Sequence, residues 1–331
     1  MLETLSVVAS ESRFMRANES LKMLKPVSEP LEGETLKRAI VEFARHASTE
    51  ISTHDEDSLP VLVSTLPRGT AIYVAHTPKA TLNEVVATAV SLQQLGFRAS
   101  PHIVARRIPS QQALETGLQH LASAGVEQAL LVAGDLDKPL GPYTSTLDII
   151  DSGLLQNSSL KRLGIAGHPE GHKQVPEPVL LAALRQKQAF GARTGLKLHI
   201  ATQFTFDADA ILAWDERLTR EGITLPAHIG IAGPTPLPKL LKYAVACGVG
   251  ASLNSVMKNM SAIRKLARLA TTPDEMLTGL VRGGSAQGSS RIVQPHFYAF
   301  GGVAATARWI RAVIDGNFQV RPDGGKFVMD A

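Results

Sequence analysis

The segments Gly164-Ile-Ala-Gly-His-Pro-Glu-Gly-His-Lys173 and Ala201-Thr-Gln-Phe-Thr-Phe-Asp207 indicate how this chain folds. Each is a short apolar run that ends abruptly in polar, hydrogen-bonding residues. Buried parallel strands have this pattern where their carboxyl ends open into a site. We therefore expect a parallel α/β fold whose chemistry lies at the strand ends.

The same unit, a β-rich run followed by a polar loop and an amphipathic helix, repeats along the chain. Alternating strands and helices imply parallel pairing with right-handed crossovers. Eight units are the number that closes a (β/α)8 TIM barrel, and an open doubly wound sheet is the competing fold. The predicted strands span residues 47–53, 71–76, 100–105, 128–134, 162–168, 197–204, 227–233 and 295–301.

The chain divides into an N-terminal helical extension, residues 1–46, and a catalytic barrel, residues 47–331. The extension has apolar residues among charged ones and a break at Pro26 and Pro30. The stretch Gly283-Gly-Ser-Ala-Gln-Gly288 lacks the Lys-Ser/Thr pair of a phosphate-binding loop. Its turn residues predict a flexible connection between a helical region, residues 254–282, and the last strand.

Composition narrows the function classes. The net charge is +4, and no dense Lys/Arg run is interleaved with aromatic residues, so we expect no nucleic-acid partner but a mildly cationic site for an anionic ligand. Cys247 is the only cysteine, which excludes an internal disulfide and favours the cytoplasm. No apolar run approaches the roughly 18 residues of a membrane span, and charges interrupt the N-terminus where a signal peptide would be apolar.

Polar side chains recur where the predicted strands end, so we expect them at one rim of the barrel. Taken singly, each histidine is more readily a structural residue than a catalyst. We predict no metal site in residues 168–172, because Pro169 prevents a regular element from aiming three ligands at one ion. A loop against a cofactor is the preferred interpretation. The rim residues are Glu50, His76, His102, Asp135, His168, His172, Gln203 and His296.

Glu50 has one functional interpretation, and Asp135 and Lys187 have two each. Burial of Glu50 in a short strand would favour its protonated form, which suits a general acid. Asp135 follows Gly134 directly, so it could accept hydrogen bonds from the edge of a flat ring, or cap the next helix. Lys187 could bind a phosphate group or be a solvated helix lysine.

Several motifs, in order and spacing from about residue 47 to 315, resemble those of the methylenetetrahydrofolate reductase family. The matching segments are Leu-Val-Ala-Gly134-Asp135, Gly167-His-Pro-Glu-Gly-His172, Lys187-Gln-Ala-Phe-Gly-Ala192, Thr202-Gln-Phe-Thr-Phe-Asp207, Gly230-Ile-Ala-Gly-Pro234 and His296-Phe-Tyr298.

The resemblance implies a (β/α)8 barrel that holds FAD and binds tetrahydrofolate derivatives and NADH or NADPH in turn at the flavin. By motif, Glu50 would be the acid that opens the folate ring, Asp135 would contact the pterin, and Gln203 with Phe206 would bind the folate. The resemblance assigns to the cofactor site His76, His102, Gly134, Tyr143, His168, His172 and Lys187.

The chain departs from the family pattern at several flavin positions. Ala75, Leu180 and Ala183 stand where polar contacts are usual, which predicts loosely bound FAD. Three other functions stay open: flavin-independent hydride transfer from NADH to folate, a pterin-binding methyltransferase, and a non-catalytic folate-binding subunit. The resemblance leaves open the working direction, including oxidation of methyl-folate after demethylation of a growth substrate, and a homo-oligomeric state.

Overall fold

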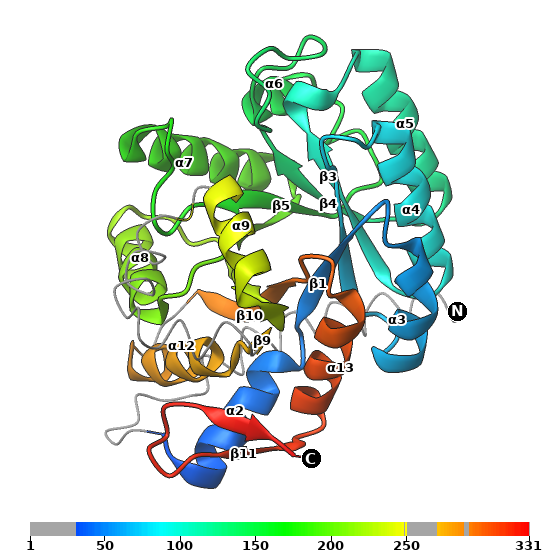
Figure 1. Ribbon diagram of the computed structural model, residues 1–331. Coiled ribbons are helices and arrows are strands. Elements are labelled where there is room, and N and C mark those ends of the chain that lie inside the picture. The colour runs from blue at the N-terminus through cyan, green and yellow to red at the C-terminus, as the bar shows by residue number, and fades with distance from the viewer. Residues whose placement is uncertain (1–30, 248, 250–269, 288–290, 331) are drawn as a thin grey trace, which may run out of the picture.

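Eight parallel strands close into a barrel in the order β1-β10-β7-β6-β5-β4-β3-β2 (Figure 1). The computed structural model describes residues 31–247, 249, 270–287 and 291–330. The (β/α)8 prediction is confirmed, and the open doubly wound sheet is wrong. The barrel strands are β1 (Ser48–Ser52), β2 (Ala71–Ala75), β3 (Arg98–Val104), β4 (Gln128–Val132), β5 (Arg162–Gly167), β6 (Lys197–Thr202), β7 (Ala227–Ala232) and β10 (Ile292–Tyr298).

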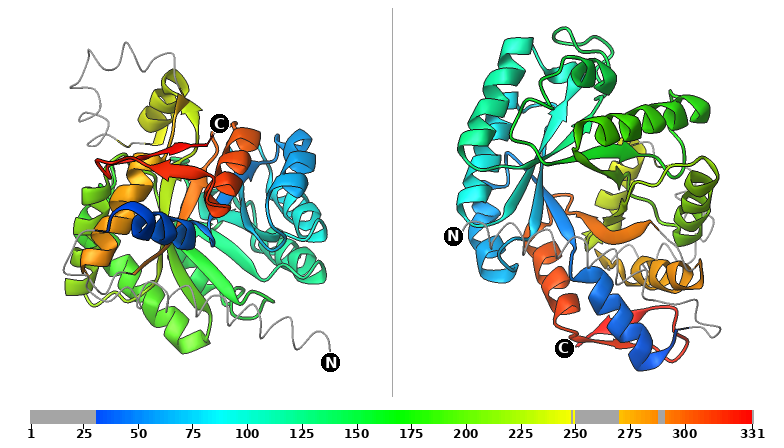
Figure 2. Two further views of the ribbon diagram at one scale, coloured as in Figure 1. Left: turned by 90° about the horizontal axis from the view of Figure 1, so that it is seen from below. Right: turned by 180° about the vertical axis from the view of Figure 1, so that it is seen from behind.

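Helices surround the strands on the outside of the barrel, as the two views of Figure 2 show. Two small antiparallel pairs are added to this layout, β8 (Thr235–Pro236) with β9 (Ala270–Thr271) and β11 (Phe318–Val320) with β12 (Phe327–Met329). The helices are α2 (Gly33–Ala44), α3 (Leu59–Thr65), α4 (Leu82–Gln94), α5 (Gln111–Ser123), α6 (Thr146–Asp151), α7 (Glu177–Thr194), α8 (Ala208–Arg220), α9 (Leu237–Cys247), α12 (Asp274–Gln287) and α13 (Val303–Ile314), with 3-10 turns η1 (Glu56–Ser58) and η2 (Ala105–Arg107).

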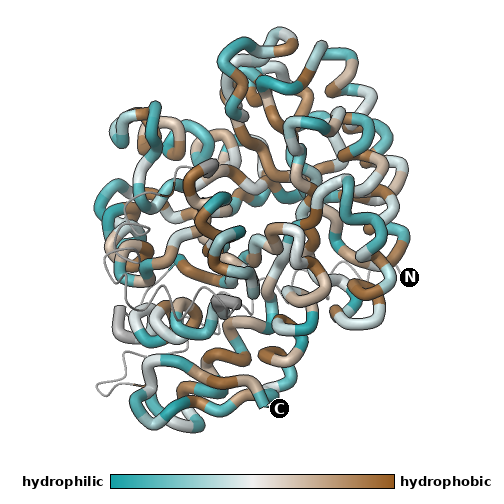
Figure 3. Tube along the Cα trace, in the orientation of Figure 1, coloured by the Kyte–Doolittle hydropathy of each residue, from teal (hydrophilic) through white to brown (hydrophobic). Residues whose placement is uncertain are grey.

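The main hydrophobic core lies between the barrel strands and the helices. Alternate strand residues such as Ile72 and Val74 of β2 are fully buried there and pack with helix residues such as Val85 and Leu92. Figure 3 shows this pattern as apolar strands enclosed by helices of mixed polarity. The intervening strand residues point into the barrel, so the alternation decides which side chains reach its interior and rim.

Helix α2 agrees with the helix predicted at the end of the N-terminal extension. Its residues Leu36, Ile40 and Phe43 are buried, and it packs against α12 and α13. Pro26 and Pro30 lie outside the described residues. Within the described ranges, no helix combines the length and the apolar character needed to span a membrane.

The predicted flexible connection at residues 283–288 is wrong up to Gln287, because these residues continue α12. Gly288 lies outside the described residues, as do residues 254–269 of the predicted helical region. A Cβ atom at Gly279 would lie 2.8 Å from Ala208 Cβ, and one at Gly283 would collide with Leu212 Cδ1. Glycine therefore lets α12 approach α8 closely, and this packing outweighs the turn propensity of the segment.

Candidate active site

Glu50 lies in the middle of β1, between His102 of β3 and His296 of β10. Its side chain is 17% exposed. Its Oε2 atom is 3.8 Å from His102 Nε2 of β3 and 3.7 Å from His296 Nε2 of β10. Thr49 and Ile51 face the other way: the Thr49 hydroxyl donates to Phe297 O, and Ile51 belongs to the outer core. Strand alternation thus turns the Glu50 carboxyl inward.

A hydrogen-bond chain from Gln294 through Ser48 holds His296 beside Glu50. The Gln294 amide donates to Ser48 Oγ over 3.4 Å, and Ser48 Oγ is hydrogen-bonded to His296 Nδ1, 2.9 Å away. This contact turns the other ring nitrogen of His296, Nε2, toward Glu50. Burial, only partly offset by Glu50, lowers the pKa of His102 to about 4, so this second imidazole is neutral at pH 7.

Asp135 is held by a buried arginine. Arg107 Nη2 donates to Asp135 Oδ1 over 2.6 Å, and the side chains are 7% and 76% exposed. The helix-cap interpretation of Asp135 is wrong, because the next helix, α6, is capped by Ser145. Gly134 has a φ of +94°, and a Cβ there would lie 2.5 Å from Val104 Cγ1, so only glycine fits where the chain leaves β4. The Asp135 carboxylate therefore has a fixed partner and a solvent-facing side.

His76 lies after β2 and donates from Nε2 to Ala80 O over 3.1 Å. Burial lowers its pKa, an effect opposed by the Ala80 hydrogen bond and reinforced by the nearby Arg107 cation. Tyr143 is 4% exposed within the main core, and burial raises its pKa. Both residues were predicted to bind the cofactor, and the structure places His76 near Arg107 and Tyr143 in the loop before α6.

A second group of cofactor candidates lies after β5. The imidazole rings of His168 and His172 meet edge to face, with centroids 5.0 Å apart. Lys187, on α7, is 7% exposed, and burial lowers its pKa to about 8. The solvated-lysine interpretation of Lys187 is therefore wrong. Burial lowers the pKa of His168 to about 4, with smaller contributions from His172 and Lys187, which places the three side chains in one electrostatic neighbourhood.

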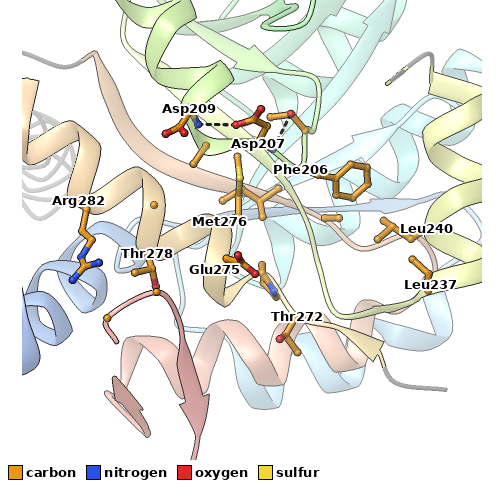
Figure 4. A pocket seen from close by; sticks show the side chains of 18 of the residues that line it. Phe206, Asp207, Asp209, Leu237, Leu240, Thr272, Glu275, Met276, Thr278 and Arg282 are labelled. Carbon is orange, nitrogen blue, oxygen red and sulfur yellow. Dashed lines mark hydrogen bonds between the residues drawn. The ribbon is translucent and has the colours of Figure 1, made fainter. Parts of the chain in front are cut away.

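Gln203 and Phe206 follow β6, which is separated by β5 from β4, the strand that precedes Asp135. The Gln203 N–H donates to Gly167 O, and its side-chain Oε1 accepts from Phe204 N–H. Phe206 packs edge-on against Phe204 with ring centroids 5.7 Å apart. It also lines a cavity of about 440 Å³, mostly apolar, with Leu237, Leu240 and Met276 among its walls (Figure 4).

Several buried polar atoms near the rim have no hydrogen-bond partner among the described residues. A native structure seldom leaves such atoms unpaired, so they are positions that a ligand or water would complete. No group of three or more His, Cys, Asp and Glu residues in the described ranges is arranged to hold a metal ion. The unpaired atoms are Thr53 Oγ1, His76 Nδ1, Thr77 Oγ1, His102 Nε2 and Tyr143 OH.

The structure groups the predicted residues into neighbourhoods around the rim. Glu50 lies beside His102, and the His168 ring contacts that of His172, with Lys187 close enough to affect its pKa. Asp135 contacts Arg107 and belongs to neither of these groups. Sequence reasoning missed Arg107, although the Arg106-Arg107 pair directly after a predicted strand was a usable signal. It placed His296 on the rim but gave it no role.

A family model described as methylenetetrahydrofolate reductase matches residues 63–307. The matched region covers about three quarters of the 331-residue chain, from α3 into α13, and includes Asp135, Lys187 and Gln203. Strand β1 with Glu50 precedes the matched region, so its place in the site depends on the barrel geometry described above. The match and the closed (β/α)8 barrel together show that this chain belongs to the methylenetetrahydrofolate reductase family.

Proposed function

We propose that this protein interconverts 5,10-methylenetetrahydrofolate and 5-methyltetrahydrofolate with NADH or NADPH, using FAD. The observation that carries the proposal is the Glu50 carboxyl, 17% exposed and faced by two imidazole nitrogens inside a barrel of this family. Opening the five-membered folate ring requires a proton donor. A carboxyl that is shielded from water but open to the barrel mouth supplies one.

The other rim residues have binding roles. Asp135 accepts hydrogen bonds from the pterin edge with the oxygen that Arg107 leaves free, since Arg107 holds only Oδ1. Gln203 orients the folate from the loop after β6, where its backbone N–H is hydrogen-bonded to Gly167 O. Phe206 offers an aromatic ring at the mouth of the apolar cavity. These contacts orient the substrate relative to Glu50 and keep water away from it.

The residues present fit a flavin dinucleotide. Lys187 is a buried cation that a phosphate group would pair, with His168 and His172 beside it. The unpaired atom His76 Nδ1 is a hydrogen-bonding position that the polar edge of a flavin ring would fill, and His102, whose Nε2 atom faces Glu50, would line the ring. When bound, FAD would accept and donate the hydride, while the protein supplies orientation, charge and a proton.

FAD binding is expected to be loose. The side chains of Ala75, Leu180 and Ala183 carry no polar atoms, and each missing hydrogen bond weakens binding by about 0.5 to 1.5 kcal/mol. Three such losses correspond to roughly 10- to 10³-fold in affinity. The same three residues favour the second candidate function, direct hydride transfer from NADH to folate. Membership of a reductase family favours both over a methyltransferase or a non-catalytic folate-binding subunit.

A titration of apoprotein with FAD under anaerobic conditions tests the proposal. Bound flavin absorbs at about 450 nm, so saturable binding that restores folate-dependent NADH oxidation would support the proposal. Folate reduction at full rate in flavin-free protein would support direct transfer instead. If the protein binds folate but reduces it neither with FAD nor without it, both the flavin-dependent reaction and direct hydride transfer are refuted. The same assay, run with 5-methyltetrahydrofolate and an electron acceptor, determines the working direction.

We also expect the enzyme to be cytoplasmic and to form homo-oligomers.

A further inference from the structure

The interior of the barrel is lined by histidines and a tyrosine. The barrels of this architecture usually fill this space with branched aliphatic side chains. Here Tyr73 of β2, His199 of β6, His228 of β7 and His296 of β10 are each at most 5% exposed and contact one another inside the strands. Burying polar groups costs free energy unless each finds a partner, so this composition needs a reason beyond packing.

The hydroxyl of Tyr73 is anchored to two stacked imidazoles. It lies 2.8 Å from His199 Nε2 and 3.5 Å from His228 Nδ1, and the two imidazole rings stack with centroids 4.0 Å apart. Burial lowers the pKa of both histidines, to about 3 for His199, so both are neutral at pH 7. A phenol hydroxyl can then donate to one ring nitrogen and accept from the other, which fixes its orientation.

A glycine makes room for this anchor. At Gly164, on β5 next to β6, a Cβ atom would lie 2.9 Å from His199 Nε2 and 2.8 Å from Leu130 Cδ1. Any other residue there would push the His199 imidazole away from the Tyr73 hydroxyl. The anchoring hydrogen bond is therefore supported by residues from three strands.

The ring of Tyr73 packs against the two imidazoles that face Glu50. Its centroid is 4.5 Å from that of His296 and 6.2 Å from that of His102, the second in an edge-to-face arrangement. Neither imidazole is within hydrogen-bond distance of Glu50, since the separations are 3.7 and 3.8 Å. His296 is also hydrogen-bonded to Ser48 through Nδ1, but the tilt of its ring and the position of His102 beside the carboxyl depend on what packs against them.

We propose that Tyr73 is a positioning residue for Glu50, holding His296 and His102 against the carboxyl while His199 and His228 hold Tyr73. The proposal rests on the proposed function, because it takes Glu50 as the proton donor. Tyr73 acts on the reaction through its neighbours and does not touch the substrate. The ring is the part that positions the imidazoles, and the hydroxyl is the part that fixes the ring.

Replacement of the ring tests the proposal. In Tyr73→Leu we expect kcat to fall about tenfold or more with KM changed less than about threefold, and the pH dependence of kcat to move, because a small displacement of catalytic groups lowers turnover more than binding. Tyr73→Phe keeps the ring but loses the contacts of its hydroxyl with His199 and His228, so its kcat and pH profile should lie between those of the unmodified protein and those of Tyr73→Leu. Tyr73→Met, whose flexible side chain adapts better to the space left by the ring, replaces Tyr73→Leu if that variant does not fold.

Phe318→Leu is the matched control. Phe318 is fully buried in β11, away from the barrel interior, so its loss removes a comparable ring. We expect this variant to lose thermal stability while keeping kcat and the pH profile. A folded ring-less Tyr73 variant with normal kcat and pH profile would overturn the proposal, as would an equal loss of kcat in Phe318→Leu.

A second measurement separates this proposal from the proposed function. Nitrogen-15 NMR of the histidine side chains reports the surroundings of His102 and His296 whether or not the protein reduces folate. We expect their resonances to shift in Tyr73→Leu and to stay in place in Phe318→Leu. If folate turnover is absent in the unmodified protein but these shifts occur, the proposed function fails and the positioning contact stands. If the shifts are absent, the positioning contact fails.

Discussion

The buried neutral histidines should make the protein unstable in mild acid. Burial lowers the pKa of His199 to about 3 and of His102 to about 4, against 6.5 for an unfolded chain. Above pH 6.5 both states carry neutral imidazoles, so their contribution to stability is intact. Below pH 6.5 the unfolded chain binds protons that the folded protein does not, and the free energy of unfolding falls by about 1.4 kcal/mol per pH unit for each histidine.

Integrated from pH 7.5 to 5, each of these two histidines removes about 2 kcal/mol, so together they remove about 4 kcal/mol. His228 acts in the same direction, because burial and the neighbouring His199 lower its pKa as well. The total stability of a typical domain is about 5 to 15 kcal/mol, so this loss is a large share of it. Because carboxylates mostly titrate near pH 4, the loss of stability between pH 6.5 and pH 5 comes mainly from the histidines.

Urea denaturation at several pH values between 7.5 and 5 measures this effect. His199→Gln, which keeps an acceptor for the Tyr73 hydroxyl, should reduce the slope of stability against pH by about 1.4 kcal/mol per unit. His120→Gln is the control, since His120 is exposed on α5 and should leave the slope unchanged. A free energy of unfolding that stays constant between pH 7 and 5, or an unchanged slope in His199→Gln, would refute the reasoning.

Three further predictions concern the rim. Glu50→Gln should lower turnover about 100-fold while the folate dissociation constant changes only a few-fold, and near-normal turnover would place the acid elsewhere. Asp135→Ala should weaken folate binding and lower the denaturation midpoint, because Arg107 is left buried without its partner. The double variant Asp135→Ala with Arg107→Met should recover the midpoint but not folate binding. Recovery of folate binding in the double variant would contradict the role of Asp135. The pKa of Lys187 is about 8, so FAD affinity should fall about tenfold between pH 7 and 9; Lys187→Arg should remove this pH dependence, and its persistence would exclude Lys187 as the group responsible.

The barrel could be predicted from the sequence because its signals are local. Each strand is a short apolar run with a polar end, and an amphipathic helix follows most of these runs. All eight barrel strands could therefore be located within a few residues. The region 283–287 shows where local signals fail. Its glycines have turn propensity, but contacts with α8, which lies far away in sequence, keep them helical.

The candidate site could be predicted only in part. The strands that carry Glu50 and His296 could be located, but both residues lie within their strands and not at the ends where the sequence pattern placed them. The anchoring of Tyr73 by His199 and His228 could not be predicted, because it requires closure of β2 against β6 and β7 across the barrel interior. The Arg107 contact with Asp135 likewise depends on how two adjacent loops approach each other. Such convergence is a tertiary property that no single segment encodes.

The central claim, that this protein is a folate reductase that uses FAD and the Glu50 carboxyl, is tested most directly by one product measurement. Apoprotein is incubated anaerobically with NADH and 5,10-methylenetetrahydrofolate, with and without FAD, and 5-methyltetrahydrofolate is quantified by chromatography, alongside Glu50→Gln. We predict product with FAD, little without it, and about 100-fold less in Glu50→Gln. No product with FAD present, or equal product from Glu50→Gln, would contradict the account.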